Sequence, residues 1–249
     1  MIEAKKFDDK FYDSQADGSY QSALVILPLI NALIKPRSVL DVGCGVGTWL
    51  KVWSEKFNVQ DIVGIDGDYV NREHLKIPQQ NYLGKDLKQS FSLGRKFDLA
   101  MSVEVGEHLP ESVSTILVDN LIQHSDVVVF SSANLEQRGT YHINEKPPEF
   151  WAKIFAERKY IAVDILRDRI WNDESVEWWY RQNILIYVNK DSIDKFPALA
   201  ERAKFTSIDS LFRIHPKLWK YRNEENETRS HLGSFLKWKL SEIKKSIFK

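Results

Sequence analysis

The stretch SVLDVGCGVGTWL, residues 38–50, constrains the fold more than any other part of the chain. A short apolar run of strand type ends in three glycines, Gly43, Gly45 and Gly47, and a helical pattern then resumes. Glycine lets the backbone turn tightly at the end of a strand and leaves its amide groups accessible to a ligand. Cys44, between the glycines, adds only a small side chain. We therefore expect a nucleotide-like ligand to bind against this main chain.

The spacing of the glycines excludes two common nucleotide sites. A dinucleotide loop of the type G-x-G-x-x-G that began at Gly43 would need its third glycine at position 48, where the chain has Thr48. The chain also has no G-x-x-x-x-G-K-[ST] segment, the loop that cradles phosphates in nucleoside triphosphatases. The loop is therefore expected to serve a different ligand.

Short β-rich runs alternate with helical patterns between residue 38 and about residue 188. This alternation is typical of β-α-β units and predicts an α/β fold, a doubly wound and mostly parallel sheet. Strands are predicted at 38–42, 60–65, 80–83, 97–102, 125–131, 160–165 and 183–188, and helices at about 20–34, 47–57, 111–122 and 147–158.

The pattern changes after Asn189. The chain has 249 residues, of which 43% are apolar, so it can bury a substantial core and is most simply one domain with an appendage. We predict a domain over residues 1–189 and a helical C-terminal extension over residues 190–249. Within the extension, residues 190–230 read as mixed and irregular, with a solvated linker at 222–230.

A basic amphipathic helix is predicted at the end of the chain, in HLGSFLKWKLSEIKKSIFK (231–249). Its apolar stripe consists of Leu232, Leu236, Leu240, Ile243 and Ile247, and lysines occupy other positions. One interpretation docks this stripe on its own domain or on a partner. The other lays the helix on an anionic membrane surface.

Nothing in the sequence predicts export or a transmembrane anchor. The N-terminal stretch is polar and charged, and the longest apolar run, 23–34, is too short to span a bilayer. Cys44 is the only cysteine, so no intramolecular disulfide can form. We expect a cytoplasmic protein, placed at the inner face of the membrane if the terminal helix binds lipid. The oligomeric state is left open.

The formal net charge is zero, but it is unevenly distributed. Residues 190–249 contain 14 basic and 8 acidic side chains, a balance of +6, which leaves −6 for the residues before them. A negatively charged body gives no general electrostatic reason to bind nucleic acid. We therefore expect a small-molecule or glycan partner and no nucleic acid.

Three carboxylates follow the first three predicted strands. Asp66 ends the second strand, where a carboxylate can accept both hydroxyls of a ribose. Asp86 follows the third strand and can accept a hydrogen bond from an adenine amino group, and Asp41 lies just before the glycine loop, where it can hold an ammonium group. Ribose, adenine and ammonium are three parts of S-adenosylmethionine. That compound has no phosphates, which agrees with a loop without lysine or arginine.

Four sequence blocks carry a resemblance to a known family. VLDVGCGVGTWL, GID, KDL and FDLAMSVEVGEHLP follow one another as they do in class I S-adenosylmethionine-dependent methyltransferases, and the resemblance covers roughly residues 12–190. It implies a seven-stranded Rossmann-like methyltransferase fold with an antiparallel last strand, and an enzyme that uses S-adenosylmethionine.

The loop and the acids together give an expected set of cofactor contacts. They are Tyr20, Asp41, Gly43, Cys44, Gly45, Gly47, Thr48, Asp66, Gly67, Asp86, Leu87 and Glu104. Tyr20, at the front of the first helix, owes its place to the family resemblance. It also fits a second interpretation, a surface aromatic of the N-terminal segment.

A cluster of acids and histidines follows the fourth predicted strand. Glu104, Glu107 and His108 form the pattern E-x-x-E-H, and a helix that begins near residue 105 would bring all three together. His142 lies in the loop after the fifth strand, which overhangs the same crevice in a doubly wound fold. Two carboxylates and two imidazoles suit a divalent cation such as Mg²⁺ or Mn²⁺, which would hold a diol and lower the pKa of a hydroxyl.

The same cluster resembles metal sites of known methyltransferases. E-x-x-E-H with a later histidine resembles the site of small-RNA 2′-O-methyltransferases, and E-x-x-E-H alone resembles that of ubiquinone-pathway O-methyltransferases. Two interpretations need no metal. In one, His108 or His142 is a general base and Glu107 assists it. In the other, the acids cap a helix and the histidine packs against the adenosyl group.

The methyl acceptor is less constrained. The stretches HINEKPPEFWAKIFAERKY and WNDESVEWWYRQNILIYVN resemble methyltransferases associated with bacterial surface-polysaccharide biosynthesis. Aromatic faces before the last strand can stack on a sugar ring or belong to the core; these are Trp171, Trp178, Trp179 and Tyr180. Nearby arginines can bind a phosphate or sugar acid or lie in solvent; these are Arg167, Arg169 and Arg181.

The leading hypothesis is an O-methyltransferase that acts on a hydroxyl of a sugar or glycan precursor. The alternatives are N-methylation of a small amine such as phosphoethanolamine, RNA 2′-O-methylation, and a non-catalytic scaffold module. The acidic body disfavours RNA. The intact glycines and cofactor acids disfavour a scaffold that has lost its chemistry.

Overall fold

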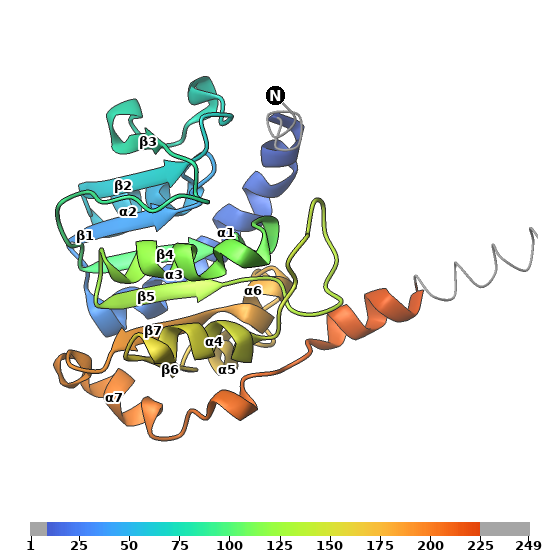
Figure 1. Cartoon of the computed structure of the whole chain (residues 1–249). Coiled ribbons are helices and arrows are strands. Elements are labelled where there is room, and N and C mark those ends of the chain that lie inside the picture. Colours follow the sequence, from blue (N-terminus) through green and yellow to red (C-terminus); the bar gives the residue numbers. More distant parts are fainter. Residues whose placement is uncertain (1–8, 225–249) are drawn as a thin grey trace, which may run out of the picture. The chain divides into compact units, whose positions relative to one another are not determined.

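The computed structural model describes residues 9–224, with side chains from residue 17 onward (Figure 1). The chain divides into two compact units, one up to Arg213 and one that begins at Ile214. The predicted domain boundary at residue 189 falls inside the first unit. The amphipathic helix predicted at 231–249 lies outside the described residues, and in the second unit residues 216–224 are helical.

A seven-stranded sheet organises the first unit, and it confirms the predicted fold class. Five strands run parallel in the order β3-β2-β1-β4-β5, and β7 pairs antiparallel with both β5 and β6. The strands are β1 (Ser38–Val42), β2 (Asp61–Asp66), β3 (Tyr82–Gly84), β4 (Leu99–Val103), β5 (Val127–Ser131), β6 (Tyr160–Val163) and β7 (Leu185–Asn189).

The central strands are apolar on both faces because helices cover both. Along β1, Val39 belongs to the hydrophobic cluster on one face and Leu40 to the cluster on the other. All five residues of β5 are buried, which explains its continuous run VVVFS. Alternation of neighbouring residues between two cores is what a strand in the middle layer requires.

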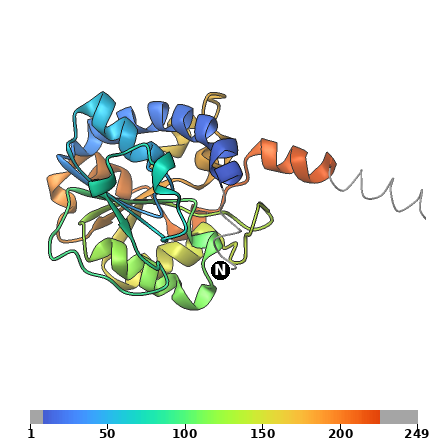
Figure 2. The same cartoon turned by 90° about the horizontal axis from the view of Figure 1, so that it is seen from above.

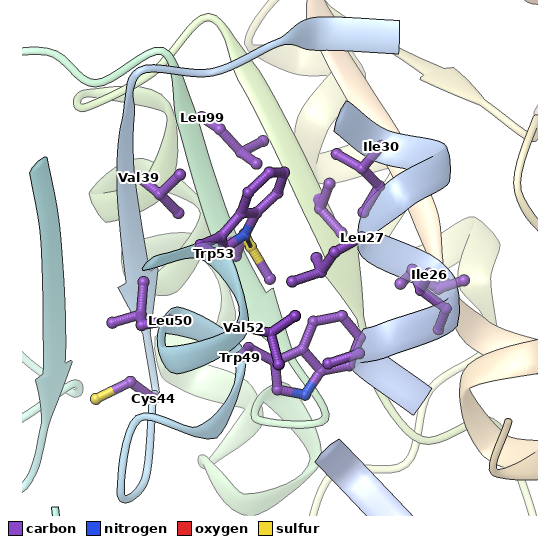
Figure 3. Close-up of a cluster of buried hydrophobic side chains, with 14 of the residues drawn as sticks. Ile26, Leu27, Ile30, Val39, Cys44, Trp49, Leu50, Val52, Trp53 and Leu99 are labelled. Atoms are coloured by element: carbon purple, nitrogen blue, oxygen red, sulfur yellow. Dashed lines mark hydrogen bonds between the residues drawn. The ribbon is translucent and has the colours of Figure 1, made fainter. Parts of the chain in front are cut away.

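The first face of the sheet carries α1 (Asp9–Ile34) and α2 (Thr48–Phe57), and the second carries α3 (Ser114–Ile122) and α4 (Pro148–Glu157) (Figure 2). On the first face, apolar residues of α1 and α2 interlock over β1 and β4 (Figure 3). Trp53 of α2 is fully buried there, and its indole nitrogen donates to the sulfur of Met101 at 3.2 Å.

The ends of the predicted helices have local causes. Asn58 closes α2 in the left-handed conformation, with φ of 55°, and its amide donates to the carbonyl of Trp53. Pro147 and Pro148 open α4 where their missing amide protons cost nothing.

Several short elements were not predicted. They are the helices α5 (Arg167–Ile170), α6 (Trp178–Asn183) and α7 (Pro197–Ala203), and the single 3₁₀ turns η2 (Arg72–His74), η3 (Gln79–Asn81), η6 (Ile193–Lys195) and η7 (Ile208–Ser210). Two more 3₁₀ turns lie where helix was expected, η4 (Gly106–His108) and η5 (Glu111–Val113). The prediction that residues 190–230 are irregular is therefore wrong for α7 and for the helical residues 216–224, three of which fall in the predicted linker at 222–230. Leu199 of α7 is fully buried in the first-face core, an anchor that the mixed sequence does not reveal.

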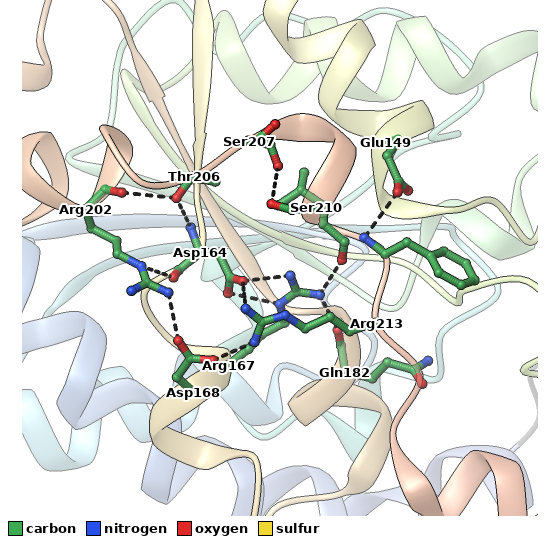
Figure 4. A network of polar contacts seen from close by, with 12 residues as sticks. Glu149, Asp164, Arg167, Asp168, Gln182, Arg202, Thr206, Ser207, Ser210 and Arg213 are labelled. Carbon is green, nitrogen blue, oxygen red and sulfur yellow. Dashed lines mark hydrogen bonds and ion pairs between the residues drawn. The ribbon is translucent and has the colours of Figure 1, made fainter.

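A buried ion-pair network fastens residues 202–213 to the end of β6 (Figure 4). Arg167 is fully buried and forms a two-pronged pair with Asp164, at 2.9 and 2.7 Å. Its third nitrogen donates to the carbonyls of Gln182 and Leu211, at 3.0 and 2.8 Å. The suggestion that Arg167 binds a substrate phosphate is therefore wrong, because all three of its nitrogens are used inside the protein.

Within the described part of the chain, no helix combines the length and the apolar character that crossing a membrane requires.

Candidate active site

Most of the predicted site residues lie at the carboxyl ends of β1, β2, β4 and β5, while Asp86 and Leu87 follow β3 and Tyr20 lies on α1. The chain leaves β1 toward β2 on one side, and it returns to pair β4 with the other side of β1. In open α/β sheets, ligands usually bind in the crevice at such a reversal of strand order, which here is the place between the loops that follow β1 and β4.

The glycine loop after β1 is as bare as the sequence predicts. Gly43 and Gly47 both have φ of 84°, in the left-handed region that favours glycine. A Cβ on Gly43 would lie 2.3 Å from the Val105 side chain, and one on Gly47 would lie 2.9 Å from Ile77. The loop is held because the amides of Gly43 and Cys44 donate to the carbonyl of Ile65, at 2.7 and 3.1 Å.

Asp66 is fixed at the end of β2 by donors on both sides. One carboxylate oxygen accepts from the Gly45 amide at 2.7 Å, and the other accepts from the Gly67 amide at 2.7 Å and from the Tyr69 hydroxyl at 2.8 Å. Burial raises the pKa of Asp66, and these three hydrogen bonds partly oppose it. Asp66, the residue predicted to bind the ribose, thus also accepts a hydrogen bond from the glycine loop.

Asp41 lies beneath the loop and is 4% exposed. Burial, with a smaller contribution from the Asp66 charge, raises its pKa to about 8. Among the residues that the structure describes, no hydrogen bond or ion pair to its carboxylate is recorded. A cation such as an ammonium group beside Asp41 would stabilise the ionised form of its buried carboxyl group.

The other predicted cofactor contacts are spread around this crevice. Cys44 is buried, and burial raises the pKa of its thiol. Thr48 begins α2 directly after the loop, Gly67 is buried after β2, and Leu87 is 6% exposed.

Two of the predicted contacts are more exposed. The Asp86 carboxylate is half exposed and accepts from the amide of Lys88 at 3.0 Å, so it also closes a local turn. Tyr20 is partly buried on α1 against the first-face core, with the Lys51 ammonium 5.6 Å from the centre of its ring. Their contact with a cofactor stays a prediction.

A tight group of ligand atoms forms where β4 ends. One atom each from Glu107, His108 and His142 lies within 4.8 Å of the others. Glu107 and His108 belong to η4, so the expected helix start is a single 3₁₀ turn, and His142 comes from the loop after β5 as expected. The two histidine rings meet edge to face, with their centres 5.0 Å apart.

Glu104 lies beside this group but not in it. Its backbone has φ of 56°, a conformation rare for glutamate, and its carboxylate accepts from Gln137 at 3.1 Å and from Asn183 at 3.2 and 3.4 Å. Burial and the neighbouring Glu107 raise its pKa to about 8. Three of the four predicted metal ligands therefore converge, and the fourth is occupied by amides.

The environment sets the protonation of the cluster. Burial raises the pKa of Glu107, which is 1% exposed, to about 7, although hydrogen bonds such as that from the Ser132 hydroxyl at 3.0 Å oppose the shift. Burial and the nearby His142 lower the pKa of His108 to about 4. His108 is therefore neutral near pH 7 and can act as a ligand or a base.

Several residues around the cluster were not predicted from the sequence. They are Ser132, Gln137, Glu145 and Asn183, all with side-chain hydrogen bonds to the predicted acids or to His142. Only the sequence around Glu145 offers a signal, since a carboxylate three residues after a histidine can bind its ring. The sequence gives no such signal for Gln137 or Asn183. Gln137 lies in the loop after β5, and Asn183 reaches Glu104 because α6 leads into the antiparallel strand β7.

The aromatic segment before β7 is partly core. Tyr180 is 4% exposed, packs edge to face on Trp49 at 5.3 Å, and Trp179 packs against the same core. Trp178 and Trp171 are partly exposed. Arg181 is buried and donates to the carbonyl of Trp171 at 3.3 Å, so it does not lie in solvent.

Comparison with known proteins gives one family match and many similar structures. The family model described as a methyltransferase domain matches residues 12–209. A probable chloroplastic tocopherol O-methyltransferase of Oryza sativa subsp. japonica is 36% identical over 86 residues, which cover 31% of this chain and 23% of that protein. The match thus spans about a quarter of the length of that relative.

Solved structures share the fold at low sequence identity. The plantazolicin methyltransferase BpumL, in complex with a pentazolic desmethylPZN analogue and SAH, is similar with a TM-score of 0.55 and 16% identity, over 74% of this chain and 90% of that one. The magnesium protoporphyrin IX methyltransferase ChlM of Synechocystis PCC 6803 with bound SAM has a TM-score of 0.52 and 18% identity, over 76% and 95%. The methyltransferase domain of bacterial CtHen1-C has a TM-score of 0.51 and 20% identity, over 68% and 97%.

The strand order of the sheet, the similar solved structures and the family match all indicate the same fold. The chain belongs to the methyltransferase domain family, and it shares its fold with methyltransferases solved with bound SAM or SAH.

Proposed function

We propose that this methyltransferase acts on a hydroxyl group of a sugar or glycan precursor, and that a divalent cation held by Glu107, His108 and His142 assists it. The observation that carries the proposal is the convergence of these three ligand atoms within 4.8 Å at the end of β4. The end of β4 faces the same crevice as the glycine loop.

The crevice fits the cofactor group by group. The loop at Gly43–Gly47 adopts the bare, tightly turned backbone that the cofactor loop requires, with Val105 and Ile77 packed against its glycines, and Asp66 is fixed where the ribose hydroxyls are expected. The buried Asp41 carboxyl supplies the negative partner that an ammonium group needs. When bound, S-adenosylmethionine supplies the methyl group as an electrophile.

The donor set also fits a hard or borderline divalent ion. One carboxylate and two imidazoles leave coordination positions open for oxygen atoms of a substrate, which suits Mg²⁺ or Mn²⁺. When bound, such an ion lowers the pKa of a coordinated hydroxyl. Glu104 helps to position the cluster, because its carboxylate shares a hydrogen bond with Glu107 and accepts hydrogen bonds from the side-chain amides of Gln137 and Asn183.

The chain's own side chains then divide the work. Glu107 and the two histidines would hold the ion against the acceptor hydroxyl and so orient it. In the metal-free alternative, neutral His108 would instead accept the proton of that hydroxyl. A shallow, open hollow of about 420 Å³ lies next to this cluster, lined by Arg138, Gly139, His142, Ile143 and Glu145. It offers an acceptor a mixture of apolar and charged contacts within reach of His142.

Hydroxyl chemistry has limited support from the comparisons. The rice relative is named as an O-methyltransferase, and its match covers 86 residues. The sugar or glycan acceptor follows from the sequence resemblance to surface-polysaccharide methyltransferases. The partly exposed Trp171 and Trp178 supply aromatic faces of the kind that stack on sugars.

Metal dependence tests the proposal directly. Turnover of a hydroxyl acceptor should fall to background after chelation and return with Mg²⁺ or Mn²⁺. Glu107→Gln should lower the rate about 100-fold or more while calorimetric affinity for the cofactor stays close to that of the wild type. Full turnover by the chelated protein would exclude the metal and favour a histidine base. Full turnover by Glu107→Gln would contradict both roles.

A further inference from the structure

The loop between β5 and α4 holds both histidines of the cluster by the same ring atom. His142 Nδ1 lies 2.8 Å from a carboxylate oxygen of Glu145, and the two side chains are only 12% and 18% exposed. His108 Nδ1 lies 3.3 Å from the main-chain carbonyl of Tyr141. Both partners come from one stretch of five residues.

These contacts select one tautomer of each ring. A carbonyl oxygen or an ionised carboxylate can only accept a hydrogen bond, so the bonded Nδ1 must carry the proton. In His142 the other ring nitrogen, Nε2, then carries no proton. His142 can therefore present Nε2 as its ligand atom, the state in which a histidine binds a metal ion.

The loop is fastened to η4, so the position of Glu145 is set relative to the cluster. The amides of Ile143 and Asn144 donate to the carbonyl of Glu107, at 2.8 and 3.1 Å. The Asn144 side chain donates to the carbonyl of Gly106 and to the Ser114 hydroxyl, both at 3.2 Å. Glu145 follows directly on this doubly anchored segment.

Space beside the ring is also restricted. A Cβ on Gly139 would lie 2.3 Å from Nε2 of His142, so this edge of the ring lies close to the bare backbone of Gly139, and a side chain there would collide with it. The ring is therefore held at Nδ1 by Glu145, and glycine keeps a side chain away from Nε2 on this side.

We propose that Glu145 is the positioning residue of His142, and that it fixes the Nδ1-protonated tautomer and directs Nε2 toward the bound cation. The inference rests on the metal-assisted function proposed above. Outer carboxylates of this kind typically change metal affinity by about 10- to 100-fold when they are removed. Glu145 acts through His142 and is not itself a ligand.

The first measurement is Mn²⁺ binding to the full chain by calorimetry, without cofactor or acceptor. Glu145→Ala should weaken Mn²⁺ binding about 10- to 100-fold. Glu145→Gln, which keeps an oxygen that can accept from Nδ1, should recover part of the loss. Glu111→Gln is the matched control, because Glu111 pairs with Lys146 of the same loop at 2.5 Å and does not contact His142. It should keep wild-type affinity within about twofold.

The second measurement is the tautomer of His142 in the metal-free protein, read from the ¹⁵N shifts of the histidine rings. The wild type should show a protonated Nδ1 and an unprotonated Nε2, and Glu145→Ala should lose this preference while its thermal unfolding stays close to that of the wild type. This signal depends on neither activity nor metal.

The outcomes separate the two proposals. Unchanged Mn²⁺ affinity and an unchanged tautomer in Glu145→Ala would overturn the positioning role. An equal loss in Glu111→Gln would also overturn it, since the effect would then belong to the loop as a whole. A wild-type chain without measurable Mn²⁺ affinity would overturn the metal-assisted function and the metal-directed half of this inference, and the tautomer would then decide whether Glu145 orients His142.

Discussion

At the scale of single residues, Asp41 couples cofactor binding to protons. Its pKa is raised to about 8, so at pH 7 most molecules without cofactor hold the proton on this carboxyl group. A neighbouring ammonium group favours the ionised form and lowers that pKa. Binding at pH 7 should therefore release most of one proton, and cofactor affinity should increase as the pH rises from about 6 to 8.

Calorimetry in two buffers of different ionisation enthalpy measures this release. Asp41→Asn has no proton to lose, so it should bind the cofactor more weakly, with heats that hardly differ between the buffers. Equal proton release from the wild type and Asp41→Asn would assign the coupling to another group and leave Asp41 without this role.

Gly43 combines a positive φ with a position where a side chain would collide with its neighbours. In Gly43→Ala the new Cβ would lie 2.3 Å from Val105, and the backbone would also keep its φ of 84°. We expect an affinity for S-adenosylhomocysteine at least about 10-fold weaker and a loss of about 1–3 kcal/mol in the free energy of unfolding.

Gly94→Ala separates steric contact from backbone strain. Gly94 also has positive φ, 67°, but nothing lies within 4 Å of its added Cβ. It should cost about 1 kcal/mol of stability and leave ligand affinity unchanged. If both variants bound S-adenosylhomocysteine as the wild type does, the glycine loop would not be the cofactor cradle.

The residues of the candidate site were predictable only where a local pattern marks them. The glycines, Asp66 and the E-x-x-E-H group follow strand ends, so the sequence alone places them on one edge of the sheet. Gln137 and Asn183 bind Glu104 through buried amides that no spacing announces. Their positions depend on how a loop and an antiparallel strand return to the crevice.

At the scale of elements, the strands were easier to predict than the short helices. Each of the seven predicted strands overlaps an observed one, because a strand buried on both faces needs a continuous apolar run. α5 and α6 have four and six residues, too few for a helical period to stand out. α7 is fixed by the burial of Leu199, a tertiary contact.

The hydrogen bonds and ion pairs of Arg167 lead us to expect that the stability of the fold depends on this residue of the short helix α5. Arg167→Met would leave Asp164 buried with Arg213 as its remaining ion-pair partner at 3.1 Å, and would remove the guanidinium hydrogen bonds to the carbonyls of Gln182 and Leu211. We expect a loss of about 3 kcal/mol in the free energy of unfolding, measured by urea denaturation.

Arg169→Met, in the same short helix but exposed, should change stability by less than about 0.5 kcal/mol. A similar, small effect of both substitutions would mean that α7 and residues 202–213 are held mainly by apolar contacts. The network would then be an accessory to the packing of the first-face core.

At the scale of the whole molecule, charge distinguishes the remaining acceptor classes. The chain has 35 basic and 35 acidic residues, and the residues before 190 carry a net charge of −6. Binding to RNA depends on the neutralisation of phosphates by basic side chains, and a negative body opposes it. A labelled RNA should therefore show no saturable binding at physiological salt.

With cofactor and Mg²⁺, a pool of glycan precursors should gain the mass of one methylene group per acceptor, detected by mass spectrometry. The control is the same pool with Glu107→Gln, which should gain none. Tight, salt-sensitive RNA binding with methylation of a ribose would reverse this assignment and make the acceptor a nucleic acid.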